Sequence, residues 1–168
     1  IDLRQLDPAE FRKQVGYMPQ DVTLFHGSLR ENITLSHPFS RDEQILKAAK
    51  IATLTEFVNR HPQGFDMMIS ERGDSLSGGQ RRAVALARAV LHDPNLLLMD
   101  EPTGSMDHST EIAVKNELAE FVKGKTWIVV THRNSLLEMA DRILVLDNGR
   151  IVADGPKDTV VTALRQGR

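Results

Sequence analysis

The sequence predicts an α/β protein with a partly parallel sheet, flanking helices and a helical middle part. Short apolar runs in the second half of the chain alternate with segments of helical composition, and this alternation is typical of α/β folds. Between residues 27 and 92, helix-start signals and a stretch rich in Ala, Leu and Arg dominate instead. The chain therefore divides into three zones within one domain, residues 1–26, 27–92 and 93–168.

Composition limits the possible functions. The chain has 168 residues, of which 40% are apolar and 26% charged, so it is long enough for a hydrophobic core of its own. A net charge of -2 provides no general attraction to nucleic acid or to an anionic membrane. The absence of cysteine excludes disulfide and thiolate chemistry. No apolar run approaches the roughly 20 residues that span a bilayer, and residues 1–6 do not resemble a signal peptide.

The first zone predicts one short helix and one apolar segment. Pro8 fits the first turn of a helix over residues 8–14, because its missing N–H needs no partner there. The apolar step Val15–Met18 follows and leads to Gln20.

The second zone contains two helix starts with caps. Ser28 precedes a helical stretch and has Glu31 three residues later, as a capping box requires. Ser40 stands in the same relation to Glu43 at the start of a helix over residues 41–51. Both serines are therefore predicted to cap helices.

The strongest helix signal closes the second zone and strand signals open the third. Gly79–Leu91 has no Pro or Gly after its start, which predicts a mostly buried helix. The run Leu96–Met99 predicts a strand of a parallel sheet, covered on both faces. Asn148 and Gly149 favour a tight turn, so the runs beside them should pair antiparallel. The other elements expected here are a turn at 93–95, helices over 109–122, 136–140 and 157–165, and strands over 127–130, 143–146 and 151–153.

The segment Leu76–Gln80 stands directly before the strongest helix. Gly78 and Gly79 let a ligand approach the backbone closely, and the N–H groups at a helix start point outward. With the Ser77 hydroxyl as a further donor, these groups form a cradle for phosphate oxygens. The same residues are also typical of simple helix capping, so the two interpretations stay open on these residues alone.

Two strand ends carry polar side chains suited to catalysis. Asp100 and Glu101 follow an apolar run, as in the Walker B arrangement, where the first acid holds Mg²⁺ through water and the second orients the attacking water. Acids at the start of a helix after a strand are the structural alternative. His132 ends a second apolar strand, and ligands of open α/β sheets bind outside the carboxyl ends of strands, although a lone His is more often structural.

The order and spacing of these segments resemble the ATP-binding cassette (ABC) family along nearly the whole chain. The resemblance implies a P-loop NTPase-like core with an α-helical subdomain, with ATP and Mg²⁺ as ligands. It identifies Leu76–Gln80 as the LSGGQ signature, Asp100 as the Walker B acid and Glu101 as the catalytic glutamate. It also implies that Gln20 is the Q-loop residue, which senses Mg²⁺ and nucleotide. By the same resemblance, Asp107 is the D-loop aspartate, which couples two sites, and His132 is the switch histidine, which contacts the γ-phosphate.

The phosphate-binding loop Gly-x-x-x-x-Gly-Lys-Ser/Thr does not occur in these 168 residues. The similar stretch Gly124-Lys125-Thr126 has Ala119 where the first glycine belongs, and it precedes a strand, whereas a P-loop follows one. In the family that loop lies upstream of the Q-loop, so we expect the sequence to be an N-terminally shortened part of a cassette. By itself it should bind ATP poorly and not hydrolyse it, since most phosphate contacts would be missing.

The resemblance also implies partners. Cassettes of this family pair head-to-tail, with ATP between the P-loop of one and the signature of the other. Residues 22–33 and Glu71-Arg72-Gly73 resemble exporter cassettes, in which this surface meets the transmembrane domain, although Met67–Ser70 departs from the usual Thr-Glu-Val-Gly. The homodimer partner and the transmembrane domain are therefore the expected partners.

The segments 4–8 and 57–66 look most like bacterial type I secretion ATPases, which export repeat-toxin or adhesin proteins. This resemblance implies a place at the cytoplasmic face of the bacterial inner membrane. The competing class is a soluble ABC ATPase that acts on nucleic acid. The sequence has no heptad run and no basic stripe of the kind found in that class, so we expect no nucleic-acid partner.

Overall fold

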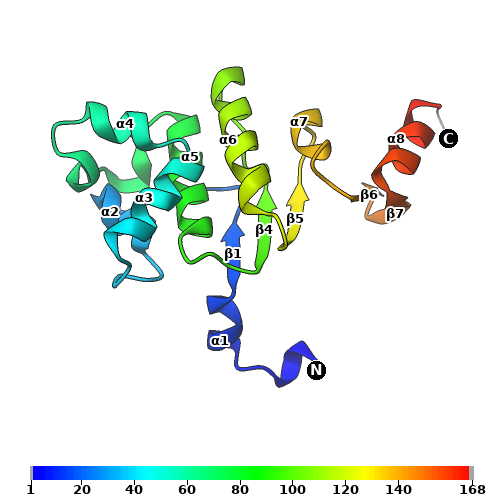
Figure 1. Ribbon diagram of the computed structural model, residues 1–168, viewed down its shortest axis with the longest axis horizontal. Helices are drawn as coiled ribbons and strands as arrows, with labels where there is room; N and C mark the ends of the chain where they lie inside the picture. The colour runs from blue at the N-terminus through cyan, green and yellow to red at the C-terminus, as the bar shows by residue number, and fades with distance from the viewer. Residues whose placement is uncertain (1, 167–168) are drawn as a thin grey trace. The chain divides into compact units, whose positions relative to one another are not determined.

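The computed structural model describes residues 2–166, shown as a ribbon in Figure 1. The chain forms two compact units, Ile1–Val130 and Thr131–Arg168, and the boundary falls directly after strand β5. The first unit holds a parallel sheet with helices, and the second holds a hairpin with helices. No helix within residues 2–166 has the length and apolarity needed to cross a bilayer.

The sheet of the first unit consists of parallel strands. In spatial order they are β1 (Val15–Met18), β4 (Leu96–Asp100) and β5 (Thr126–Val130). Met18, Met99 and Val129 stand side by side in the register. In Figure 1 the three arrows lie next to one another and point the same way. The predicted α/β fold with a partly parallel sheet is therefore confirmed.

The two faces of this sheet differ in burial. Met18, Leu97 and Met99 lie on the covered face and are at most 3% exposed. On the opposite face, Tyr17 is 62% exposed and Ile128 is 55% exposed. The prediction of a strand covered on both faces therefore holds for one face only, because the helices of this unit pack against that side.

The helical zone lies between β1 and β4 in the chain, as predicted. It also contains a short antiparallel ladder, β2 (Gly27–Ser28) with β3 (Met68–Ile69), which the sequence did not reveal. The helices of the first unit are α1 (Pro8–Lys13), α2 (Leu29–Thr34), α3 (Asp42–Ile51), α4 (Thr55–Arg60), α5 (Gly78–Val90) and α6 (His108–Phe121), with 3₁₀ turns at Leu3–Gln5, Gly64–Asp66 and Glu71–Gly73.

One of the two predicted capping serines is confirmed and the other is wrong. The Ser28 hydroxyl accepts from the Glu31 N–H at 3.1 Å, and the Ser28 N–H donates to the Glu31 carboxylate at 2.7 Å. The Ser40 hydroxyl instead donates to the carbonyl oxygen of His37 at 2.8 Å. Arg41 takes the cap position of α3, and its N–H donates to the Gln44 side chain at 2.9 Å.

Helix α5 packs against α2, α3 and β1. Most of its length after the first turn is buried, as predicted. Its approach to β1 is close, because a Cβ on Gly16 would lie 2.2 Å from the carbonyl oxygen of Ala89 and 2.8 Å from a side-chain carbon of Pro94. Only glycine fits at position 16, since that main-chain oxygen cannot move unless the helix shifts.

The second unit contains the predicted hairpin, in which Asn148 and Gly149 both have positive φ, 48° and 75°. The predicted helix over residues 136–140 is wrong in its bounds, because Met139 and Ala140 donate to carbonyls only three residues back and the α-helical pattern ends. The elements of this unit are α7 (Asn134–Leu137), β6 (Arg142–Asp147), β7 (Arg150–Pro156) and α8 (Lys157–Arg165).

Gly16→Ala should lower the free energy of unfolding of the 168-residue chain by about 3 kcal/mol, as overpacking against a fixed main-chain atom does. Denaturant unfolding followed by the fluorescence of Trp127, which lies in β5 of the same unit, measures this change. Tyr17→Ala is the matched control, since Tyr17 is the next residue of the strand and is 62% exposed. A change within about 1 kcal/mol is expected there, and equal losses for both variants would contradict the packing argument.

Candidate functional site

The segment Ser77–Gln80 forms the first turn of α5. The Ser77 hydroxyl accepts from the Gln80 N–H at 3.1 Å, and the Gln80 side-chain oxygen accepts from the Ser77 N–H at 2.8 Å. The capping interpretation is therefore realised. It is compatible with phosphate binding, because the Ser77 hydroxyl can still donate and the N–H groups of Gly78 and Gly79 have no acceptor within the helix.

The two signature glycines also have a packing role that the sequence did not reveal. A Cβ on Gly78 would lie 3.1 Å from Ser105 Cβ, and a Cβ on Gly79 would lie 3.1 Å from the Ser105 carbonyl oxygen. The missing side chains thus let the loop after β4 pack directly on the first turn of α5. The structure brings the signature and this loop together within one chain.

The acid pair stands at the carboxyl end of β4. Asp100 is the last residue of the strand and is half-buried. Glu101 leaves the strand with a φ of 46°, its N–H donates to the Val130 carbonyl at 2.9 Å, and its own carbonyl accepts from the Gly104 N–H at 3.0 Å. This tight turn directs the chain from the strand end toward α5.

Gln20 and Glu101 lie at the same edge of the sheet. Met18 and Met99 are paired in the parallel register, and each of the two site residues follows two positions later. Gln20 is exposed there. His132 follows β5 by two residues and belongs to the second unit.

Asp107 is the N-cap of α6. Its carboxylate accepts from the Thr110 N–H at 3.0 Å, from the Thr110 hydroxyl at 2.6 Å and from the Ser109 hydroxyl. These hydrogen bonds hold the pKa of Asp107 well below its usual range, and the one from the Ser109 hydroxyl has the largest effect. The side chain therefore has a structural role in addition to any role between nucleotide sites.

Residues 2–166 contain no cluster of three or more His, Asp or Glu side chains able to hold a metal ion. Asp100 at a strand end nevertheless fits Mg²⁺, which usually keeps several waters and takes one or two carboxylates besides the phosphates of its nucleotide. The start of α5 likewise fits phosphate oxygens through its N–H groups. These groups therefore have the chemistry that Mg²⁺ and phosphate oxygens require.

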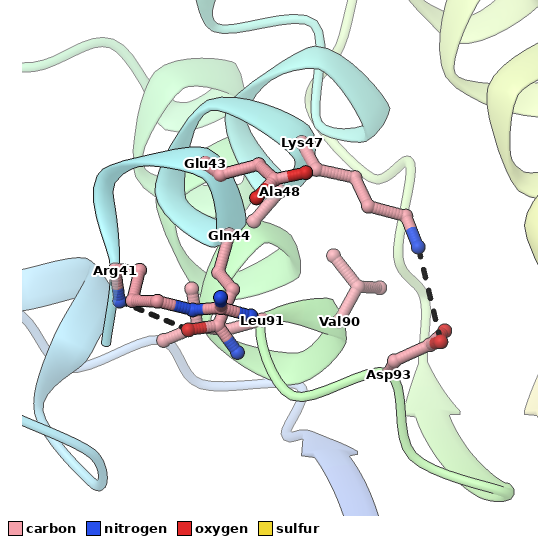
Figure 2. A pocket seen from close by; sticks show the side chains of 8 residues that line it. All are labelled: Arg41, Glu43, Gln44, Lys47, Ala48, Val90, Leu91 and Asp93. Carbon is pink, nitrogen blue, oxygen red and sulfur yellow. Dashed lines mark hydrogen bonds and ion pairs between the residues drawn. The ribbon is translucent and has the colours of Figure 1, made fainter. Parts of the chain in front are cut away.

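Two cavities of the first unit lie away from these residues. A cavity of about 210 Å³ opens between α3 and the end of α5, where the Lys47 ammonium approaches the Asp93 carboxylate at 3.8 Å (Figure 2). A second cavity, of about 550 Å³, lies beside α1 and β1. No predicted site residue lines either one.

Comparison with known proteins decides the family. A family model described as "ABC transporter" matches residues 1–104, more than half of the chain. The chain belongs to the ABC transporter family. The family predicted from the order of Gln20, the signature, the acid pair and His132 is thereby confirmed.

Several curated relatives in this family are exporters by name. The multidrug efflux ATP-binding/permease protein of Mycobacterium bovis is 42% identical over 159 residues, which are 95% of this chain and 13% of that protein. The cyclolysin secretion/processing ATP-binding protein of Bordetella pertussis is 36% identical over 162 residues, 96% of this chain and 23% of that protein. The toxin RTX-I translocation ATP-binding protein of Actinobacillus pleuropneumoniae is 40% identical over 154 residues, 92% of this chain and 22% of that protein.

A solved structure of a bacterial Atm1-family ABC exporter with ATP bound agrees in fold. The match has a TM-score of 0.88 and 34% sequence identity, and it covers 99% of this chain and 29% of that one. The ABC ATPase fold is therefore confirmed. The chain spans less than a third of the length of each of these relatives.

Asp107→Ala should lower the melting temperature of the 168-residue chain, because α6 loses its cap, whereas Asp107→Asn should nearly preserve it, since Asn caps helices as well as Asp. Thermal unfolding by circular dichroism measures both. The lowered pKa makes the carboxylate's contribution complete above about pH 4 and lost as the pH falls further, so Asp107→Asn should also weaken the acid dependence of stability. Equal destabilisation by Ala and Asn would contradict the capping role.

Proposed function

We propose that this chain is part of the ATP-binding and ATP-hydrolysing domain of an ABC exporter, which couples ATP-driven dimerisation and hydrolysis to export across a membrane. One observation carries the proposal: the Ser77–Gln80 turn at the start of buried α5 packs directly on the loop that follows Asp100 and Glu101. In the proposed site, the phosphate cradle and the two carboxylates would therefore share one rigid support.

The side chains near the strand ends have separate roles in the proposed hydrolysis of ATP. Glu101 orients the attacking water and accepts its proton, and His132 contacts the γ-phosphate. Asp100 holds the metal ion through water, and Gln20 responds to the metal and the nucleotide. Mg²⁺, when bound, neutralises charge on the phosphate oxygens.

The proposed partner at the nucleotide is a second cassette, arranged head-to-tail as a homodimer. The signature turn lies on the surface, which suits a phosphate presented by another chain. ATP then acts as a contact between the two subunits, and hydrolysis removes that contact and reopens the dimer. Asp107 follows Met106, whose Cα would lie 3.5 Å from a Cβ on Gly79, and is proposed to couple the two sites.

The second proposed partner is a transmembrane domain, which would meet residues 22–33. The names of the relatives support this, since one is an ATP-binding/permease protein and others serve secretion or translocation. A protein toxin or adhesin is the cargo class we propose, supported by the cyclolysin and RTX-I relatives, while multidrug efflux is the competing class. The corresponding location is the cytoplasmic face of a bacterial inner membrane.

The 168-residue chain by itself should not hydrolyse ATP. It contains no Gly-x-x-x-x-Gly-Lys-Ser/Thr loop, so the backbone nest and lysine that hold the β- and γ-phosphates are not among its residues. An ATP titration with Mg²⁺ should show weaker binding than for a version extended upstream by such a loop. Comparable binding by both would mean that the signature face or another site holds nucleotide alone.

In the full-length protein, Glu101→Gln should abolish multiple turnover and trap an ATP-bound dimer, because the amide cannot accept the proton of the attacking water. Phosphate release measures the turnover, and size-exclusion chromatography with ATP measures the dimer. Glu117→Gln serves as the control, since it changes a half-exposed glutamate of α6 to the same amide. Continued hydrolysis by the Glu101 variant would show that another group activates the water.

A further inference from the structure

The backbone of Glu101 adopts an unfavourable conformation. Its φ of 46° lies in the left-handed region, which a residue with a long side chain rarely occupies. Such a conformation persists only where surrounding contacts enforce it, and it is common at functional sites. The conformation sets the direction in which the Glu101 side chain leaves the strand.

Three hydrogen bonds enforce this conformation. The Glu101 N–H donates to the Val130 carbonyl at 2.9 Å, which keeps it in line with β5. The Glu101 carbonyl accepts from the Gly104 N–H at 3.0 Å and from Nη1 of Arg82 at 2.8 Å. Among these three bonds, the one from Arg82 has a side-chain donor. Arg82 lies on α5, outside the sheet and outside the loop after β4.

Arg82 is held in place over this loop. A Cβ on Gly104 would lie 2.9 Å from Nε and 3.0 Å from Cζ of Arg82, so the guanidinium lies against the bare face of the glycine. The contact is partly buried, which strengthens a hydrogen bond from a charged donor. A larger residue at position 104 would displace the guanidinium from the Glu101 carbonyl.

We propose that Arg82 is a positioning residue for Glu101 and links the signature turn to the catalytic glutamate of the same chain. Arg82 follows Gln80 by two residues on α5, about 3 Å along the helix axis. A shift of the signature turn therefore moves the donor that holds the Glu101 carbonyl. This inference rests on the proposed function, in which the signature meets the nucleotide of the partner subunit while Glu101 serves its own.

The consequence is a direct link between the two nucleotide sites of a dimer. When the signature binds the partner's nucleotide, the position of α5 is fixed. Arg82 then holds the Glu101 turn in the orientation needed for attack by water. Arg82 contacts no reacting atom. Its loss should therefore reduce the rate of the chemical step and leave nucleotide affinity nearly unchanged.

The test uses the full-length protein with Mg-ATP. Arg82→Ala should lower kcat by at least about tenfold with KM within about twofold, as loss of precise orientation does. Arg82→Lys should restore part of kcat, because it retains a cationic donor. Gly104→Ala should reproduce the loss while Arg82 is still present, and the double variant should be no slower than Arg82→Ala alone. Arg60→Ala is the control, since that arginine is exposed and pairs with Glu56.

Each outcome separates this proposal from the proposed function. An unchanged kcat in Arg82→Ala, or a loss seen only in KM, overturns the positioning role. A protein without ATP turnover, or with turnover insensitive to Glu101→Gln, overturns the proposed function itself. If Arg82→Ala does not fold, Gly104→Ala and Arg82→Lys decide, since an unchanged kcat in both contradicts the link.

Discussion

The burial of α5 is the constraint on which the first unit depends. The helix is packed against α2, α3 and β1, and the absence of a side chain at Gly16 lets the strand approach its main chain. The amino end of the same helix carries the signature turn, and its flank carries Arg82. Close-packed protein interiors transmit displacement instead of absorbing it. The first turn of α5 and the Glu101 turn are therefore two parts of one rigid assembly.

Much of the fold could be predicted because its signals are local. The capping box at Ser28 and the turn at Asn148-Gly149 each depend on residues within one short segment. The parallel sheet followed from apolar runs that alternate with helices, and the family followed from the order of motifs along the chain. Gln20 and Glu101 lie just beyond the ends of the adjacent strands β1 and β4, and Asp100 is the last residue of β4.

The features that could not be predicted depend on residues far apart in the sequence. Ser40 has the sequence pattern of a cap, but its hydroxyl is engaged by His37, so the helix begins later. The contact between Arg82 and the Glu101 carbonyl joins residues 19 positions apart, and no local sequence pattern predicts it. The signature glycines suggested a ligand, whereas their fit against Ser105 appears only when the loop is folded back.

The exposed face of the sheet offers an apolar surface for self-association. Tyr17, Leu98 and Ile128 are neighbours in the register and form an apolar row, and within residues 2–166 the outer edge of β5 has no strand partner. Such surfaces associate with one another without regard to ligand. We therefore expect the purified 168-residue chain to associate through this face, to an extent that rises with concentration. Only a change in assembly that requires nucleotide and that depends on the residues of the signature turn reports on the pairing of two cassettes.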